Sequence, residues 1–268
     1  NYVVWSDVFT CPECSAELVF YDVAFDSEKG KVSDSFICNS CNATLNKKAV
    51  SRTPDTYFDV ILKEPVSRNK QVPALINYSI NGKRFEKKPD SEDLKKLQEV
   101  ESALSKASIK PVPMMHQGGE NWGAIWRSGY HYGITHAHQF YTSRNLLILS
   151  DAWEAAPNKG IQWAISGILN YINKKQSFTG GGGGMPGVLY IASLVQEKNF
   201  IDVLERKLKS LIKVLPTLSK IRERNLCGIQ STSDLSKTVE NNSIDYVFVD
   251  PPFGANIMYS ESSFLWES

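Results

Sequence analysis

The chain has 268 residues, of which 42% are hydrophobic and 22% are charged, and its formal net charge is +1. This composition is ordinary for a soluble globular protein and gives no overall positive field, so any binding to nucleic acid requires a local basic surface. No apolar run approaches the ~20 residues of a membrane span and no signal segment opens the chain, so we expect a cytoplasmic protein without membrane contact.

Two close pairs of cysteines lie near the start. Cys11 and Cys14 form one C-x2-C pair, and Cys38 and Cys41 form the other. A two-residue gap allows a tight turn to direct both thiolates at one tetrahedral Zn²⁺, and close pairs in a cytoplasmic chain favour a metal over the alternative of two disulfides. We predict a zinc ribbon with a hairpin that turns at Gly30. Four thiolates close the coordination sphere, so we expect a structural ion.

The segment 51–110 is polar and interrupted by prolines, which predicts short strands and turns. Its last part, 91–108, carries apolar residues at helical spacing and predicts an exposed helix capped by Ser91.

The segment 111–145 interleaves aromatic residues, histidines, arginines and glycines. Such a mixture suits a nucleic-acid surface, because arginine contacts phosphates or guanine and aromatic rings stack on an extruded base. A loop whose aromatic rings fill its own core explains the composition equally well. The candidate nucleic-acid contacts are Trp122, Arg127, Tyr130, Arg144 and Asn145.

Two groups within this segment have structural alternatives. Arg144 and Asn145 stand at a predicted helix start, where a phosphate contact and a local capping network carry equal weight. The histidines are interpreted as satisfied or solvent-facing and not as metal ligands, because carboxylates are sparse around them. They are His131, His136 and His138.

Two scaffold helices are predicted next, one capped by Thr142 or Ser143 and the other over 160–175. The glycine run 180–184 is interpreted as a flexible hinge, because no strand precedes it and no Lys-Ser/Thr pair follows it as in a phosphate-binding loop. A strand, an amphipathic helix and a short strand are predicted at 187–194, 198–215 and 227–232.

The apolar run Ile244–Val249 predicts a strand buried on both faces of a parallel sheet. Such sheets bind ligands at the carboxyl ends of their strands, where Asp250-Pro251-Pro252-Phe253 follows. The Asp250 carboxylate and the rigid Pro251 carbonyl can accept both N–H groups of an exocyclic amine and direct its lone pair at an electrophilic methyl group. Phe253 can stack on a flipped base. A plain loop with a capping aspartate is the alternative.

The stretch "VDPPFG" resembles motif IV of the amino-group DNA methyltransferases, which use S-adenosylmethionine and methylate adenine N6 or cytosine N4. Together with "YVVWSDVFTCPECSAELVFYDVAF", "YTSRNLLILS", "GVLYIASLVQEKNF" and "DPPFGANIMYSE", it resembles the zinc-ribbon-containing adenine-specific DNA methylases over most of the chain. The resemblance implies that Asp250, Pro251, Pro252 and Phe253 are catalytic. It also implies that Ser233 and Asp234 contact the adenine of the cofactor.

The implied fold is α/β, a partial Rossmann-like methyltransferase sheet with an inserted four-cysteine zinc ribbon and a mixed α+β target-recognition region. The expected parts are a lead-in strand and zinc ribbon at 1–50, a target-recognition-like insertion at 51–178, and a partial catalytic domain carrying DPPF at 179–268. The chain lacks the Phe-x-Gly-x-Gly loop with which these methylases hold the cofactor. We therefore interpret it as an internal fragment that is inactive alone.

The leading hypothesis is methylation of adenine N6 in double-stranded DNA, with S-adenosylmethionine and Zn²⁺ as cofactors and a restriction-modification or defence system as a candidate partner. One alternative keeps the motif and changes the substrate to RNA bases. The other is a noncatalytic zinc-ribbon module that binds nucleic acid.

Overall fold

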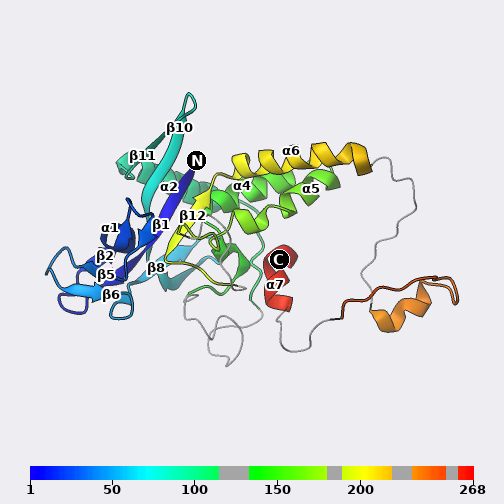
Figure 1. Cartoon of the computed structure of the whole chain (residues 1–268), viewed down its shortest axis with the longest axis horizontal. Helices are drawn as coiled ribbons and strands as arrows, with labels where there is room; N and C mark the ends of the chain where they lie inside the picture. Colours follow the sequence, from blue (N-terminus) through cyan, green and yellow to red (C-terminus); the bar gives the residue numbers. More distant parts are fainter. Residues whose placement is uncertain (115–132, 180–188, 219–230, 252–258) are drawn as a thin grey trace.

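The computed structural model describes residues 1–114, 133–179, 189–218, 231–251 and 259–268. It is a mixed α/β fold around one six-stranded sheet that curls into a half-barrel (Figure 1). The main strands follow the order β11-β10-β1-β12, and β2 and β7 pair with β1 beyond that path. Their bounds are β1 Tyr2–Thr10, β2 Glu17–Val19, β7 Ser51–Arg52, β10 Gln71–Ile80, β11 Lys83–Lys87 and β12 Leu194–Lys198.

Strand β1 is the centre of this sheet. It pairs antiparallel with β10 on one side and with β12 on the other, and a bulge between Val4 and Trp5 shifts its register against β10. Its β-branched and aromatic residues favour an extended strand with both faces covered. The buried carboxylate of Asp7 accepts hydrogen bonds from Arg52 Nε at 2.8 Å and Gln71 Nε2 at 2.9 Å, so its charge is satisfied inside the sheet.

A small ribbon extends from the far end of β1. It contains one short helix and two further hairpins, namely α1 Phe20–Ala24, β3 Phe25–Asp26, β4 Lys31–Val32, β5 Ser35–Ile37 and β6 Thr44–Asn46. Gly30 has a φ of +63°, which confirms its place in a turn. Phe9, Phe20 and Phe36 form an aromatic core here. The ring centroids of Phe9 and Phe20 are 5.1 Å apart, and those of Phe20 and Phe36 are 5.8 Å apart.

Three predicted helices form, with altered ends. The first, α2 (Ser91–Leu104), is capped by Asp90 and not by Ser91, because Asp90 and Asp93 bond reciprocally to each other's backbone N–H. Thr142 caps α4 (Ser143–Glu154), as predicted. Helix α5 (Lys159–Ser166) is shorter than expected, because the chain passes into the 3-10 turn η2 (Leu169–Tyr171).

Helix α6 (Phe200–Leu218) lies beside α4 and α5 (Figure 1). Its first turn is buried through Phe200 and Val203, but Ile201 and Ile212 of the expected apolar stripe are exposed. The large hydrophobic core lies between these helices and β12. Its fully buried members include Phe140, Ile165, Ile168, Ile172, Leu189, Val195 and Phe200.

The expected Rossmann-like parallel sheet is wrong for the described part of the chain, where every strand pairing is antiparallel. The run Ile244–Val249 forms no strand, and Tyr246 and Phe248 are each 81% exposed. The strand expected at 187–194 begins only at Leu194, and the one expected at 227–232 falls mostly outside the described residues. An apolar run becomes a buried strand only where neighbouring strands accept its hydrogen bonds, and the described residues supply none here.

The remaining elements are the hairpin β8 (Pro54–Asp59) and β9 (Glu64–Asn69), the 3-10 helices η1 (Ala137–Phe140) and η3 (Thr232–Lys237), and α7 (Tyr259–Glu267). No helix in the described ranges is long and apolar enough to span a membrane.

Candidate functional site

The two cysteine pairs lie on two matching turns. In the first, the Cys11 carbonyl accepts the Ser15 N–H at 2.9 Å, and Ser15 has a φ of +60°. In the second, the Cys38 carbonyl accepts the Asn42 N–H at 3.0 Å, and Asn42 also has a φ of +60°. The left-handed residue ends each turn so that both thiols of a pair point the same way.

The four thiols converge on one point. Their sulfur atoms all lie within 4.8 Å of one another, with Cys11 and Cys41 at 3.8 Å and Cys14 and Cys38 at 3.7 Å. A tetrahedral site with Zn–S bonds of ~2.3 Å has sulfur–sulfur edges of about 3.8 Å. The donor set and spacing therefore fit Zn²⁺, and four thiolates leave no position for a substrate.

Backbone N–H donors lower the pKa of one of the four thiols, that of Cys38. The backbone N–H groups of Cys41 and Ser40 lower the pKa of Cys38 to about 6, and the Ser40 N–H lies 3.4 Å from the Cys38 sulfur. A thiolate is the form that binds zinc, so these donors favour the bound state. Cys11 and Cys38 are buried while Cys14 and Cys41 are exposed, which places the site at the edge of the ribbon core.

The two described residues of the DPPF motif, Asp250 and Pro251, do not lie at a strand end. Asp250 and Pro251 are exposed and follow the irregular run Ile244–Val249, and Pro252 and Phe253 lie outside the described residues. Ser233 is exposed in η3, and the Asp234 carboxylate lies 2.7 Å from Lys237 Nζ. The described positions do not form a crevice for S-adenosylmethionine.

Two of the five nucleic-acid candidates are described, and both make internal contacts. Asn145 is 2% exposed, and its Nδ2 donates to the carbonyls of Ile172 at 2.9 Å and Lys198 at 3.1 Å. Arg144 Nε donates to Glu197 Oε1 at 2.7 Å. The Asn145 side chain thus binds carbonyls 27 and 53 positions away, and the local cap at this helix start is made by the Asn145 backbone N–H, which donates to Thr142 Oγ1. The other candidates, Trp122, Arg127 and Tyr130, lie outside the described residues.

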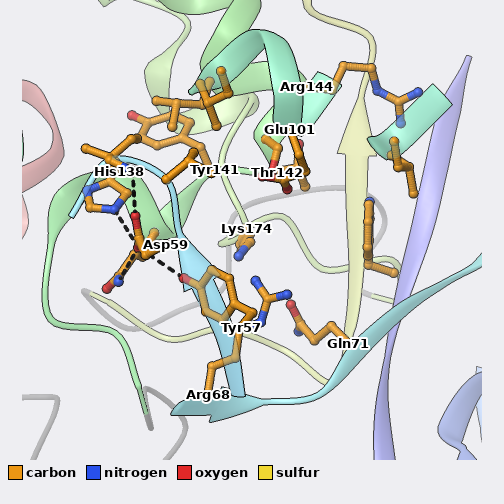
Figure 2. A pocket seen from close by; sticks show the side chains of 18 residues that line it. Tyr57, Asp59, Arg68, Gln71, Glu101, His138, Tyr141, Thr142, Arg144 and Lys174 are labelled. Atoms are coloured by element: carbon orange, nitrogen blue, oxygen red, sulfur yellow. Dashed lines mark hydrogen bonds and ion pairs between the residues drawn. The ribbon is translucent and has the colours of Figure 1, made fainter. Parts of the chain in front are cut away.

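A pocket of about 180 Å³ opens between the β8–β9 hairpin, α2 and the start of α4 (Figure 2). Arg144 is the one sequence-predicted site residue among its described lining residues. Asp59 connects several of the lining residues by hydrogen bonds. Asp59 Oδ2 accepts hydrogen bonds from Tyr57 Oη, His138 Nε2 and Gln139 Nε2, and its Oδ1 accepts two from backbone N–H groups.

Lys174 lies near the centre of the lining residues in Figure 2. Burial, followed by the nearby positive charge of Arg68, lowers the pKa of Lys174 to about 7. Sequence reasoning missed this group. Asp59 has a local signal, since it ends a strand and accepts the N–H groups of the following turn, but Lys174 has none. His138, expected to be satisfied or solvent-facing, is buried and only partly satisfied, because its Nε2 contacts Asp59 while its Nδ1 has no hydrogen-bond partner in the described structure.

Comparison of the chain with known protein families, with characterised proteins and with solved structures gives no match.

Proposed function

We propose that this chain forms part of an S-adenosylmethionine-dependent methylase that acts on an exocyclic amine in DNA, with adenine N6 as the leading target. The supporting observation is the exposed run Ile244–Val249 directly before Asp250. Five of its six residues are apolar, and those five are 56% to 81% exposed. Burying such side chains is favourable by ~25 cal/mol per Å², so the run has a strong drive to enter a sheet. Strands from outside the described residues would complete that sheet and place Asp250 at its carboxyl edge.

In that setting the residues of the motif would hold the amine. The Asp250 carboxylate would accept one N–H and the Pro251 carbonyl the other, and Phe253 would stack on the flipped base. Two acceptors on one nitrogen favour a tetrahedral geometry and so localise its lone pair. S-adenosylmethionine would supply the methyl group from a site completed by residues other than those described, with Ser233 and Asp234 as candidate contacts.

The zinc ribbon has a supporting role in this proposal. A closed four-thiolate site stabilises the fold and leaves substrate contacts to other residues. The segment with Trp122, Arg127 and Tyr130 would face double-stranded DNA, where arginine and aromatic side chains contact phosphates and bases. A restriction-modification or defence system would be the partner of such a methylase.

The test is methyl transfer from labelled S-adenosylmethionine to DNA by the product of the intact gene, followed by analysis of the modified nucleosides. Asp250→Ala should lower turnover by ~10²–10³ while leaving DNA affinity nearly intact, because phosphate contacts provide most of that affinity. Asp245→Ala is the matched control, since Asp245 is exposed in the same run. Near-normal turnover by Asp250→Ala would refute the proposed role.

A second candidate is a noncatalytic zinc-ribbon module that binds nucleic acid. It is favoured by the convergent cysteine cluster within residues 1–114 and by the irregular backbone at Asp250. Under this alternative the unaltered protein binds DNA and transfers no methyl group to DNA or RNA. Methylated RNA without methylated DNA would instead identify an RNA-base methylase.

A further inference from the structure

The pocket bounded by β8–β9, α2 and α4 contains cationic groups that the proposed methylase chemistry does not use. Lys174 and Arg68 both line it, and both also line a smaller cavity next to it. Lys174 is partly buried, and its ammonium has no hydrogen bond or ion pair within the described ranges. A partly desolvated ammonium without an acceptor is costly, because its charge loses water and gains no partner.

Arg68 is only partly satisfied. Its guanidinium stacks on the Tyr57 ring at 3.6 Å from the centroid, and its Nε lies 3.5 Å from the Asp55 carboxylate. That contact lacks hydrogen-bond geometry, so the buried Nε donor has no hydrogen-bond acceptor in the described structure. The stacking fixes the plane of the guanidinium and leaves donor capacity for a planar or tetrahedral oxyanion.

The carboxylates around Lys174 are engaged with other donors. Asp59 accepts five hydrogen bonds from its own hairpin and η1, and Glu101 of α2 accepts one from Ser143. Glu197 of β12 accepts bonds from Arg144 and Trp5. These hydrogen bonds satisfy the carboxylates without removing their charge, and they leave Lys174 and Arg68 as two cations whose donors are still available in the pocket.

The remaining lining supports a small organic anion. Leu97, Leu104 and Leu146 contribute apolar lining, and Thr142 and Ser143 at the start of α4 also line the pocket. The positive end of the α4 dipole adds to the attraction for an anion. A volume of about 180 Å³ is below the ~300–1,000 Å³ of pockets for drug-sized ligands, so the ligand is correspondingly small.

We propose that this pocket binds the phosphate group of a small phosphate ester through Lys174 Nζ and the Arg68 guanidinium, with the organic part of the ester against the leucine lining. The same phosphate chemistry occurs in a free mononucleotide and in the backbone of a nucleic acid. The small volume favours the free ester. Binding would be independent of methyl transfer, and the site needs neither zinc nor S-adenosylmethionine.

The test is isothermal titration calorimetry on the zinc-loaded protein with three probes: adenosine monophosphate, adenosine without phosphate, and a short DNA duplex. The unaltered protein should bind the monophosphate at least ten times more tightly than adenosine. Lys174→Met should weaken monophosphate binding at least tenfold. Lys175→Met is the matched control, because the neighbouring lysine is also partly buried and does not line the pocket.

Lys174→Arg guards against a folding artefact, because it restores the charge and should recover most of the affinity. Sulfate, whose charge does not change near neutral pH, gives a further readout. Its affinity should fall as pH rises from 6 to 8, by no more than tenfold per unit, because Lys174 loses its proton with a pKa of about 7. Lys174→Arg keeps its charge over this range and should remove the part of this dependence that comes from Lys174.

The outcomes separate the two phosphate sources. If the protein binds the monophosphate and this binding depends on Lys174, the ligand is the free ester. If the protein binds only the duplex and this binding depends on Lys174, the phosphate belongs to a nucleic-acid backbone. No monophosphate or sulfate binding below about 10 mM, together with unchanged duplex binding by Lys174→Met, would overturn the proposal. Neither result depends on whether Asp250 is catalytic.

Discussion

His138 Nε2 lies 2.9 Å from Asp59 Oδ2 and links η1 to the β8–β9 hairpin across 79 positions of sequence. Asp59 is 3% exposed, and its two oxygens accept five hydrogen bonds. Burial alone would raise the pKa of Asp59, but the donors His138 and Gln139 outweigh burial and hold that pKa below its usual range. This carboxylate is thus a structural anchor, and it fixes the wall of the pocket that contains Lys174.

Asp59→Asn should lower the free energy of unfolding by about 3 kcal/mol, because the amide places donors against donors in a buried network. Urea unfolding measures the change. Asp151→Asn on the exposed side of α4 is the control and should stay within about 0.5 kcal/mol. The folded pKa of Asp59 is depressed, so its contribution is present above the unfolded value of ~3.9 and is lost as pH falls through the folded pKa. An Asn variant as stable as the unaltered protein would exclude the anchoring role.

Local sequence patterns predicted the parts of the fold that local contacts determine. The two C-x2-C turns close through bonds within five residues, and Thr142 caps α4 through the nearby Asn145 N–H. The strand predicted at Ile244–Val249 does not form, because strand pairing is not determined by local contacts. Ile244–Val249 has the composition of a buried strand, but pairing depends on residues far away in sequence, and the described chain offers none.

The pocket shows a related limit. Lys174 is adjacent to Lys175, and nothing in their sequence distinguishes the residue that lines the cavity. Arg144 and Asn145 were likewise equal candidates for phosphate contact. Only the three-dimensional placement of Glu197 and of the Ile172 and Lys198 carbonyls shows what they bind.

Zinc analysis tests the cysteine cluster. We expect about one Zn²⁺ per chain, and removal of zinc by a chelator should unfold the ribbon locally, since thiolate binding is coupled to folding. Cys38→Ser should lose the ion because it removes the thiol with the lowered pKa. Cys227→Ser, which alters the cysteine outside the two pairs, should retain it. Less than about half a zinc per chain in purified unaltered protein would count against the site.

Arg144 tests whether an ion pair at the pocket rim is structural. Its partner Glu197 has a side chain that is 3% exposed, while the Arg144 side chain is 39% exposed. Arg144→Ala should lower the free energy of unfolding by roughly 1–3 kcal/mol. This is less than for a fully buried pair, because the Arg144 side chain is partly solvated and Trp5 Nε1 still donates to the Glu197 carboxylate. Arg206→Ala on the exposed face of α6 should cause little change under the same urea titration. Equal stability of both variants would show that the pair contributes nothing.

The pH dependence of stability tests the environment of Lys174 without any ligand. Its folded pKa is about 7, whereas an unfolded lysine has a pKa of ~10.4. Between these values the unfolded chain binds a proton that the folded chain has released, so the Lys174 contribution to stability increases as pH rises from about 7 to 10. The slope cannot exceed about 1.4 kcal/mol per pH unit, and residual exposure to water reduces it.

Lys174→Met removes this contribution. The variant should be more stable than the unaltered protein at pH 7, and its advantage should shrink as pH approaches 9.5. Measurements stop there, because burial raises the pKa values of Tyr57 and Tyr141 and their unfolded-state ionisation then lowers stability in both proteins. Lys159→Met, at an exposed position of α5, should run parallel to the unaltered protein over the same range. If the Lys174→Met difference stays constant from pH 7 to 9.5, the ammonium is solvated and the pocket does not hold a desolvated cation.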